Sequence, residues 1–186
     1  LCTWHDITND GAAQGTTGTH LVPAAGCKMS KTIDVYGEMT INGESGSNHQ
    51  LQSNRVDNQG ETATSAHRHF TLFSPGKLTL NHLKLTWAEV GASNDGGFIY
   101  MNSGTLAINW VHFDGSKTTG THANVGGCLA VLDGEVTIKK STFEGFSAKY
   151  GGAIYVLETS TPMTIESTTF KNNEATVRFI YRLALI

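Results

Sequence analysis

Short runs of alternating apolar and polar residues recur along the chain, separated by Gly, Asn, Asp and Ser. Three segments begin with a glycine pair: GGFIYM at 96, GGCLAV at 126 and GGAIYV at 151. Each is followed by an alternating run that ends in phenylalanine: LAINWVHF at 106–113, VTIKKSTF at 136–143 and MTIESTTF at 163–170. Alternation is typical of strands with one buried face, and no helical period fits between the runs. The pattern predicts an all-β repeat protein.

The middle residues of the alternating runs predict how the strands stack. They are Thr40, Thr79, Ala107, Thr137 and Thr164, at intervals of 39, 28, 30 and 27 residues. A repeat of short strands without a helix is typical of one coil of a parallel β-helix, and we expect about five to seven coils. The residues expected to point inward are Leu78/Leu80, Leu106/Ile108, Val136/Ile138 and Met163/Ile165, with a stacked ladder of Leu85, Phe113, Phe143 and Phe170.

The 186 residues suit one domain. We expect residues 1–31 to cap the first coil, because an open end exposes unpaired backbone groups. The β-helix would span residues 32–176, with a loop insertion near 43–65, and residues 177–186 would form an apolar strand or docking tail. The start at Leu1 and the apolar end suggest a piece of a longer protein.

Three cysteines are present. Cys2 and Cys27 bracket the polar opening segment, and we expect a disulfide between them; the alternative is two free thiols in a reducing compartment. Cys128, inside an apolar run, is expected to be a small core residue.

The segment GGAI at 151 and the segment FKNN at 170–173 resemble a known repeat. They are similar to the GGA(I/L/V) and FxxN pair of the polymorphic outer-membrane type of parallel β-helix, within the pectin-lyase-like superfamily. The resemblance covers about residues 68–176, and the repeats beginning GGFI and GGCL depart from it at the third position. It implies a right-handed coil, usually on the cell exterior, in adhesins and less often in carbohydrate-active enzymes. Because such a fold supports many activities, the resemblance implies the fold more strongly than the function.

Net charge and hydropathy argue against nucleic acid as a partner and against a membrane span. A net charge of -3 supplies no cationic field for nucleic acid. No run of 18 apolar residues is present, so we expect no membrane span. Phosphate-binding motifs of the GxxxxGK or GxGxxG type are absent from the sequence, and we expect no cofactor.

Candidate chemical groups are few. Asp114 and Glu144 each follow an inward phenylalanine and would lie one coil apart, so they are the weak catalytic candidates. The close pair His67 and His69 could clamp a metal from one face of a strand, but no third ligand can be named. We prefer a solvent-facing edge for this pair. The indoles of Trp87 and Trp110 could offer sugar-stacking platforms, with packing against the wall as the alternative.

Two surfaces could bind partners. The strands after the glycine pairs are apolar on both sides, which predicts an exposed stripe of Phe70, Leu72, Phe98, Tyr100 and Tyr155, unless the N-terminal segment or the tail covers it. A second surface is an outward column of Thr40, Thr79, Thr137 and Thr164, which resembles half of an ice-binding lattice, although Lys77, Glu135, Lys139 and Glu166 flank it.

These observations favour a non-enzymatic structural or binding module of the surface, adhesion or assembly-subunit type. It would contact a protein partner, or further domains of a longer chain, through the apolar stripe. One alternative is a carbohydrate-active enzyme of the polysaccharide-lyase or glycosidase kind, and another is an ice-binding protein. We expect an extracellular or cell-surface location, with an oxidising organelle lumen as the alternative.

Overall fold

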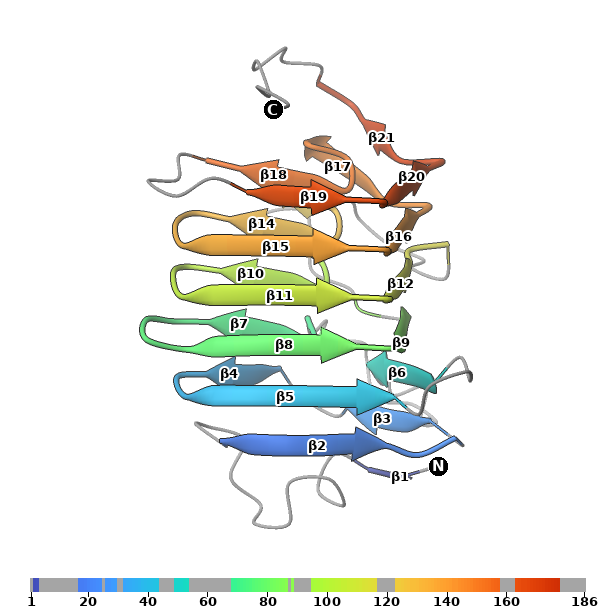
Figure 1. The fold of residues 1–186 in the computed structure, drawn as a ribbon. Coiled ribbons are helices and arrows are strands. Elements are labelled where there is room, and N and C mark those ends of the chain that lie inside the picture. The colour runs from blue at the N-terminus through green and yellow to red at the C-terminus, as the bar shows by residue number, and fades with distance from the viewer. Residues whose placement is uncertain are drawn as a thin grey trace, which may run out of the picture.

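The computed structural model describes residues 2–3, 17–24, 26–29, 32–43, 49–53, 68–86, 88, 95–116, 123–157 and 163–177. Every regular element in these ranges is a β-strand, and the strands pair in parallel. The protein is a parallel β-solenoid, which confirms the predicted fold class (Figure 1). In the described ranges there is no helix of the length and apolarity needed to cross a membrane.

The strands in the described ranges form four sheets, which we name A to D. Sheet A has seven strands: β1 (Cys2–Thr3), β3 (Cys27–Met29), β6 (His49–Ser53), β9 (Leu83–Thr86), β12 (His112–Asp114), β16 (Thr142–Glu144) and β20 (Thr169–Lys171). Sheet B has five: β4 (Ile33–Val35), β7 (Phe70–Leu72), β10 (Ile99–Met101), β14 (Leu129–Val131) and β18 (Ile154–Val156). Sheet C has six: β2 (Gly18–Val22), β5 (Glu38–Gly43), β8 (Lys77–Asn81), β11 (Thr105–Asn109), β15 (Glu135–Lys139) and β19 (Thr164–Glu166). Sheet D has three: β13 (Ala123–Val125), β17 (Ser147–Tyr150) and β21 (Glu174–Ala175).

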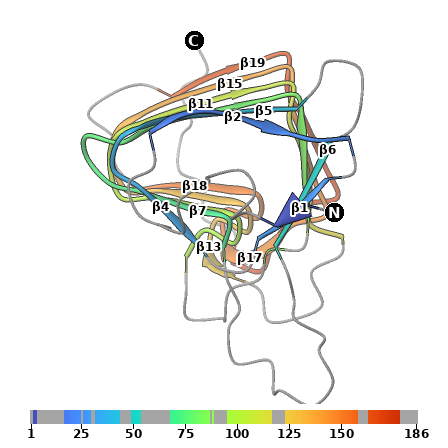
Figure 2. The ribbon, with the colours of Figure 1, turned by 90° about the horizontal axis from the view of Figure 1, so that it is seen from below.

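Each coil visits the sheets in a fixed order. In Figure 1 the chain crosses the front from left to right in sheet C, returns along the right side in sheet A, and crosses behind in sheet B while rising toward the C-terminus. That path is right-handed. Figure 2 shows three long sides enclosing the core, and sheet D lies near the corner where sheet A leads to sheet B.

The predicted columns of sheet C are confirmed by the strand register. Thr40 is opposite Thr79, which is followed upward by Ala107, Thr137 and Thr164. The inward residues of β8, β11 and β15 are at most 2% exposed. Met163 and Ile165 at the last coil are only partly buried, because no described strand lies above them.

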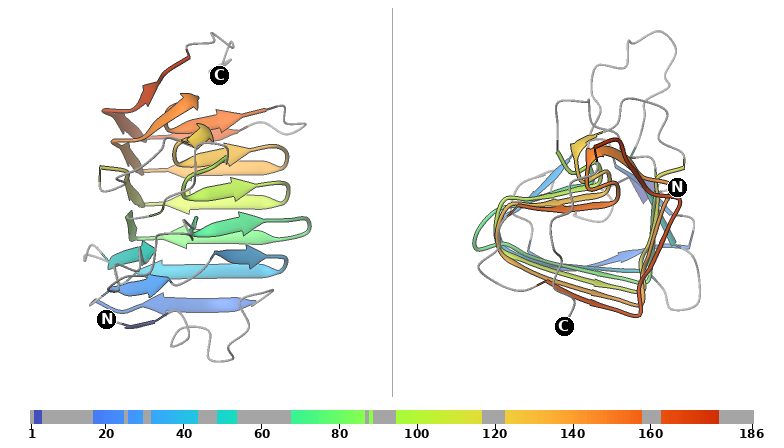
Figure 3. Two further views of the ribbon diagram at one scale, coloured as in Figure 1. Left: turned by 180° about the vertical axis from the view of Figure 1, so that it is seen from behind. Right: turned by 90° about the horizontal axis from the view of Figure 1, so that it is seen from above.

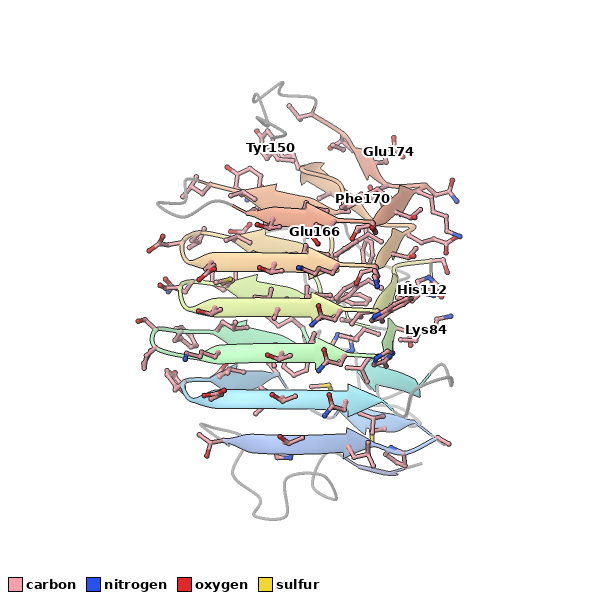
Figure 4. The ribbon with its side chains drawn as sticks, viewed as in Figure 1. Lys84, His112, Tyr150, Glu166, Phe170 and Glu174 are labelled. Carbon is pink, nitrogen blue, oxygen red and sulfur yellow. The ribbon has the colours of Figure 1, made fainter. Side chains whose placement is uncertain are left out.

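The phenylalanine ladder is also confirmed. Leu85, Phe113, Phe143 and Phe170 are in register in sheet A. The ring centroids of Phe113 and Phe143 are 4.7 Å apart, and those of Phe143 and Phe170 are 5.1 Å apart. Phe170 lies at the upper end in Figure 4 and is 45% exposed, so the ladder is interior only below it.

The two glycines of each pair have different structural roles. Gly126 has φ +58°, a left-handed conformation that a side chain disfavours. A Cβ on Gly127 would clash with the carbonyl oxygen of Gly152 in the coil above. The first glycine therefore permits the turn, and the second permits the close approach of stacked backbones.

The asparagine of the FxxN segment joins two coils. Asn173 accepts a hydrogen bond from the Phe146 backbone N–H at 3.0 Å and donates one to the Phe143 carbonyl oxygen at 2.9 Å. Both bonds satisfy backbone groups that the turn leaves outside the ladder.

Two boundaries differ in detail from the sequence expectation. The strands β2 and β3, within the expected cap of residues 1–31, pair with β5 and β6 in the same parallel manner as the other strands. The strand β6 lies within the loop expected near residues 43–65. Most of the tail 177–186 lies outside the described residues.

Candidate functional site

The expected aromatic stripe is wrong for three of its five residues. Phe70, Leu72 and Phe98 are fully buried. Phe70 pairs with Ile99 and Leu72 with Met101, both of which are buried. Phe70 and Leu72 therefore align with the inward residues Ile99 and Met101, and not with Phe98 and Tyr100 as the expected stripe required. A shift of one residue transfers every side chain of a strand to its other face.

Tyr100 and Tyr155 remain on the outer face of sheet B. They belong to a column of directly opposed residues, Asp34, Thr71, Tyr100, Ala130 and Tyr155. Both tyrosines are partly exposed, whereas Ala130 is fully buried. The outer face of sheet B thus exposes two aromatic residues, while Ala130 between them is covered.

A second outward column, which was not predicted from the sequence, follows the ends of the sheet B strands. Its members are the first residues after each strand: Tyr36, Phe73, Asn102, Leu132 and Leu157. Their stacking is set by backbone hydrogen bonds to the strand below, such as Phe73 N–H to Val35 at 3.1 Å and Leu157 N–H to Val131 at 2.9 Å. We call these five residues the corner column, because they follow the sheet B strands at the corner where sheet B turns into sheet C. That corner lies on the left of Figure 1 and on the right of the rear view in Figure 3.

The corner column is apolar at four positions and accessible to solvent. Tyr36 is 42% and Leu157 is 56% exposed, and Asn102 is exposed, while Phe73 and Leu132 are half-buried. The rings of Tyr36 and Phe73 stack with centroids 4.9 Å apart and planes within 9°. Aligning the repeats on the inward residues Val35, Leu72, Met101, Val131 and Val156 would have found the column, because each is followed by one of its members.

An arginine packs beside the tyrosine column. The Arg68 guanidinium lies over the Tyr100 ring, with Cζ 4.9 Å from the centroid. Burial lowers the pKa of Arg68, against the opposing effects of Tyr100, Asp95 and Asp34. Arginine and tyrosine are enriched among the residues that dominate the binding energy of protein interfaces.

The carboxylates proposed as catalytic candidates are in register, since Asp114 pairs with Glu144. Asp114 Oδ2 lies 3.0 Å from Lys84 Nζ, and its Oδ1 accepts hydrogen bonds from the Ser116 backbone N–H and hydroxyl. Glu144 Oε2 lies 3.0 Å from Lys171 Nζ and 3.2 Å from His112 Nε2. Figure 4 shows Lys84 and His112 on the right-hand side of the molecule, on sheet A.

The charge partners lower the pKa of both carboxyls. For Asp114, burial acts to raise the pKa, but hydrogen bonds from Ser116 and Lys84 outweigh it. For Glu144, the hydrogen bond from Lys171 is the largest effect, with His112 adding to it. A general acid needs a raised pKa to hold its proton near neutral pH, so the geometry favours an ion-pair network over acid catalysis at this pair.

The histidine pair does not form a solvent-facing edge at His69, which is fully buried, with its ring centroid 4.9 Å from that of Phe98. His67 lies outside the described residues. The described ranges contain no group of three His, Cys, Asp or Glu side chains able to hold a metal ion.

The ring of Trp110 is covered on its flanks. His82 stacks on it with centroids 6.0 Å apart and planes within 12°, and Lys140 Nζ lies 4.6 Å from its centroid. These residues share a column in which each adopts a positive φ between 50° and 57°. Although Trp110 is 53% exposed, its flanking neighbours leave less of the ring face for a sugar to stack on. Trp87 lies outside the described residues.

The outer face of sheet C is polar. Beside the threonine column, Asn109 donates a side-chain hydrogen bond to Asn81 at 2.9 Å, and Asn81 donates one to Asn42 at 2.8 Å. Above Asn109 the same column continues with Lys139 and Glu166, which form an ion pair at 3.2 Å. Over three coils, threonine or alanine and asparagine therefore stand in two parallel uncharged ranks.

The chain matches no protein-family model, and no curated protein or solved structure matches it either.

Proposed function

We propose that this chain is a non-enzymatic β-solenoid module that binds another protein through its apolar corner. The surface in question comprises Tyr36, Phe73, Leu132 and Leu157 of the corner column with Tyr100 and Tyr155 beside them, and we call it the corner face. The observation that carries the proposal is the exposure of large apolar side chains in one line at the edge of a rigid scaffold. Contiguous apolar surface of this kind marks interaction sites in soluble proteins.

The energetics favour contact with a protein. Fully burying a leucine or an aromatic side chain contributes roughly 1.5–3 kcal/mol, so a few anchors suffice for a specific complex. The column is held by backbone hydrogen bonds, so little conformational freedom is lost on binding. Arg68 and Tyr100 next to the column add an aromatic and charged anchor of the type found at interface centres.

The repeat resemblance to pectin-lyase-like surface proteins supports an extracellular or cell-surface site of action. An oxidising organelle lumen would suit the predicted disulfide equally well. Both locations are compatible with a binding module.

Site-specific photo-crosslinking in the native extract tests the proposal. A photoreactive phenylalanine analogue at Tyr36 should give a discrete adduct, whereas the same probe at Thr79 on sheet C should not. Leu132→Lys should abolish the Tyr36 adduct while circular dichroism shows the fold retained, because a charge in the contact must be desolvated. Equal labelling from Tyr36 and Thr79, or an adduct that survives Leu132→Lys, contradicts the proposal.

A second candidate function is ice binding by sheet C. The specific observation is the register of the threonine column, extended downward by Thr19, beside the hydrogen-bonded asparagine rank. Within each rank, successive residues are about 4.8 Å apart along the solenoid axis. The two ranks together therefore present a regular lattice of hydroxyl, methyl and amide groups. Thermal hysteresis that Thr79→Lys removes and Leu132→Lys leaves unchanged supports this function; its absence at high protein concentration eliminates it.

A further inference from the structure

We propose that the protein bound by the corner face is a second copy of this chain, packed side by side with its solenoid axis reversed. The proposal rests on the proposed function of the corner face and names its partner. It follows from the order of apolar and polar residues in the corner column, which is the same from the first coil to the last as from the last to the first.

The corner column is self-complementary under reversal. From bottom to top it contains two apolar residues, Asn102, and two apolar residues. In an antiparallel pair Phe73 faces the partner's Leu132 and Tyr36 faces the partner's Leu157. Asn102 then faces its own copy at the twofold axis, where each amide can donate one hydrogen bond and accept another. A symmetric dimer requires a patch of this self-complementary kind.

The regular spacing allows all these contacts at once. Stacked coils repeat about every 4.8 Å, so aligning the central coil aligns every other coil. An α-helix presents a turn about every 5.4 Å, and a single strand presents side chains on one face roughly every 6.6 Å. Neither repeat matches the column over its whole length, whereas a second solenoid does.

Charges on both sides of the corner select the antiparallel arrangement. On the sheet C side, the register places Glu38, Lys77, Thr105 and Glu135 in one column, so reversal brings Lys77 opposite the partner's Glu135. On the sheet B side, reversal brings Asp34 opposite the hydroxyl of the partner's Tyr155. A parallel twofold pair would instead bring the sheet C side of one copy against the sheet B side of the other, placing Glu38 opposite the partner's Asp34, and such a like-charge contact is unfavourable.

The contact is small. From Tyr36 to Leu157 the column spans four coil intervals, about 19 Å. An area of that length and one or two side chains in width is below the roughly 800 Å² per partner of a standard interface. We therefore expect a weak dimer whose population depends on protein concentration.

Cysteine cross-linking tests the twofold axis directly. Under mild oxidation, Asn102→Cys should form a disulfide-linked dimer of twice the chain mass, because the two copies of residue 102 meet at the axis. Thr79→Cys, on the outer face of sheet C, is the matched control and should cross-link at least about tenfold more slowly, as expected for random collision. Equal rates for the two variants overturn the proposal.

A charge exchange tests the orientation. Lys77→Glu should weaken the dimer about threefold to tenfold in sedimentation equilibrium, and adding Glu135→Lys should restore it. Failure of the double variant to restore dimerisation overturns the antiparallel arrangement. A Tyr36 photo-adduct of a mass other than the dimer, with no Asn102→Cys cross-link, overturns self-association and leaves the proposed function standing. Absence of any adduct contradicts both.

Discussion

Asp114 on β12 and Glu144 on β16 are directly opposite each other, yet each carboxylate binds a lysine from the strand on its far side. Lys84 on β9 lies 3.0 Å from Asp114, and Lys171 on β20 lies 3.0 Å from Glu144. The network joins four successive strands of sheet A and places the two carboxylates between the two lysines. Two carboxylates one coil apart are thereby stabilised in their ionised forms.

The stability of the protein should fall in acid partly through Asp114. Its pKa is lowered in the folded state from an ordinary value of 3.8, so its contribution is present above that value and is lost as the pH falls through the folded pKa. Asp114→Asn should reduce the loss of unfolding free energy below about pH 4. Urea denaturation at a series of pH values measures this, with Glu38→Gln on sheet C as the control. If the unfolding free energy of Asp114→Asn decreased in acid as much as that of the unsubstituted protein, Lys84 and Ser116 would not stabilise the ionised carboxylate.

Phe143 should be more costly to remove than Phe170, the exposed member of the phenylalanine ladder. It is fully buried and stacked between Phe113 and Phe170. Phe143→Ala should lower the unfolding free energy by about 3–5 kcal/mol, because it leaves a cavity between two rings. Phe170→Ala should cost clearly less, since Phe170 is already 45% exposed. Chemical denaturation of the two variants provides the comparison, and similar losses would contradict the interior position of Phe143.

Gly127→Ala should destabilise the protein although it adds only one methyl group. The new Cβ would clash with the Gly152 carbonyl oxygen of the next coil, a backbone atom that cannot move without breaking the stack. A cost of about 1–3 kcal/mol is expected from such overpacking. Thr137→Ala, on the outer face of sheet C, is the control and should change stability by less than about 0.5 kcal/mol. A neutral Gly127→Ala would mean that adjacent coils are farther apart than the structure shows.

Cys2 and Cys27 should form a disulfide. The strands β1 and β3 pair with these two residues directly opposite, and adjacent strands bring Cα atoms to about 4.8 Å, within the range that a disulfide spans. Loss of the bond in Cys27→Ser should cost about 3 kcal/mol by the loop-entropy argument. Intact mass without reductant should be two hydrogens below the reduced mass.

Cys128 provides the internal comparison for that measurement. It is a free, fully buried cysteine, and burial raises the pKa of its thiol well above the ordinary value. Alkylation of the native protein without reductant should therefore be slow at Cys128 and absent at Cys2 and Cys27. Rapid labelling of Cys27 in the native state would show that the predicted bond is not formed.

The sequence alone predicted the solenoid and most of its columns. Alternation with a period of two separates inward from outward residues, and the repeated glycine pairs and phenylalanines fix the frame of the last three repeats. The registers of Thr137 with Thr164 and of Phe143 with Phe170 follow directly from that frame. Local patterns suffice here because each coil pairs only with its neighbours.

The solvent exposure of the binding surface could not be read in the same way. In the repeat without a glycine pair, Phe70 and Leu72 align with Ile99 and Met101, one residue away from the alignment with Phe98 and Tyr100 that the expected stripe required, so they lie on the inner face of sheet B. The ion pairs of Asp114 and Glu144 also depend on side chains from coils above and below. The sequence shows that Asp114 and Glu144 occupy equivalent positions in successive repeats, but it does not show which lysine forms an ion pair with each carboxylate.

The chain itself determined the period, the inward ladders and the turns, since these arise from local alternation and from the steric needs of glycine. Only the tertiary structure decided that Tyr36, Phe73, Leu132 and Leu157 form one exposed line beside Tyr100 and Tyr155. The physical reason is that the register of the preceding strand decides whether a side chain points inward or outward. The side chains of the neighbouring coils then decide how much of it is exposed to solvent. Both properties depend on residues that are distant in sequence.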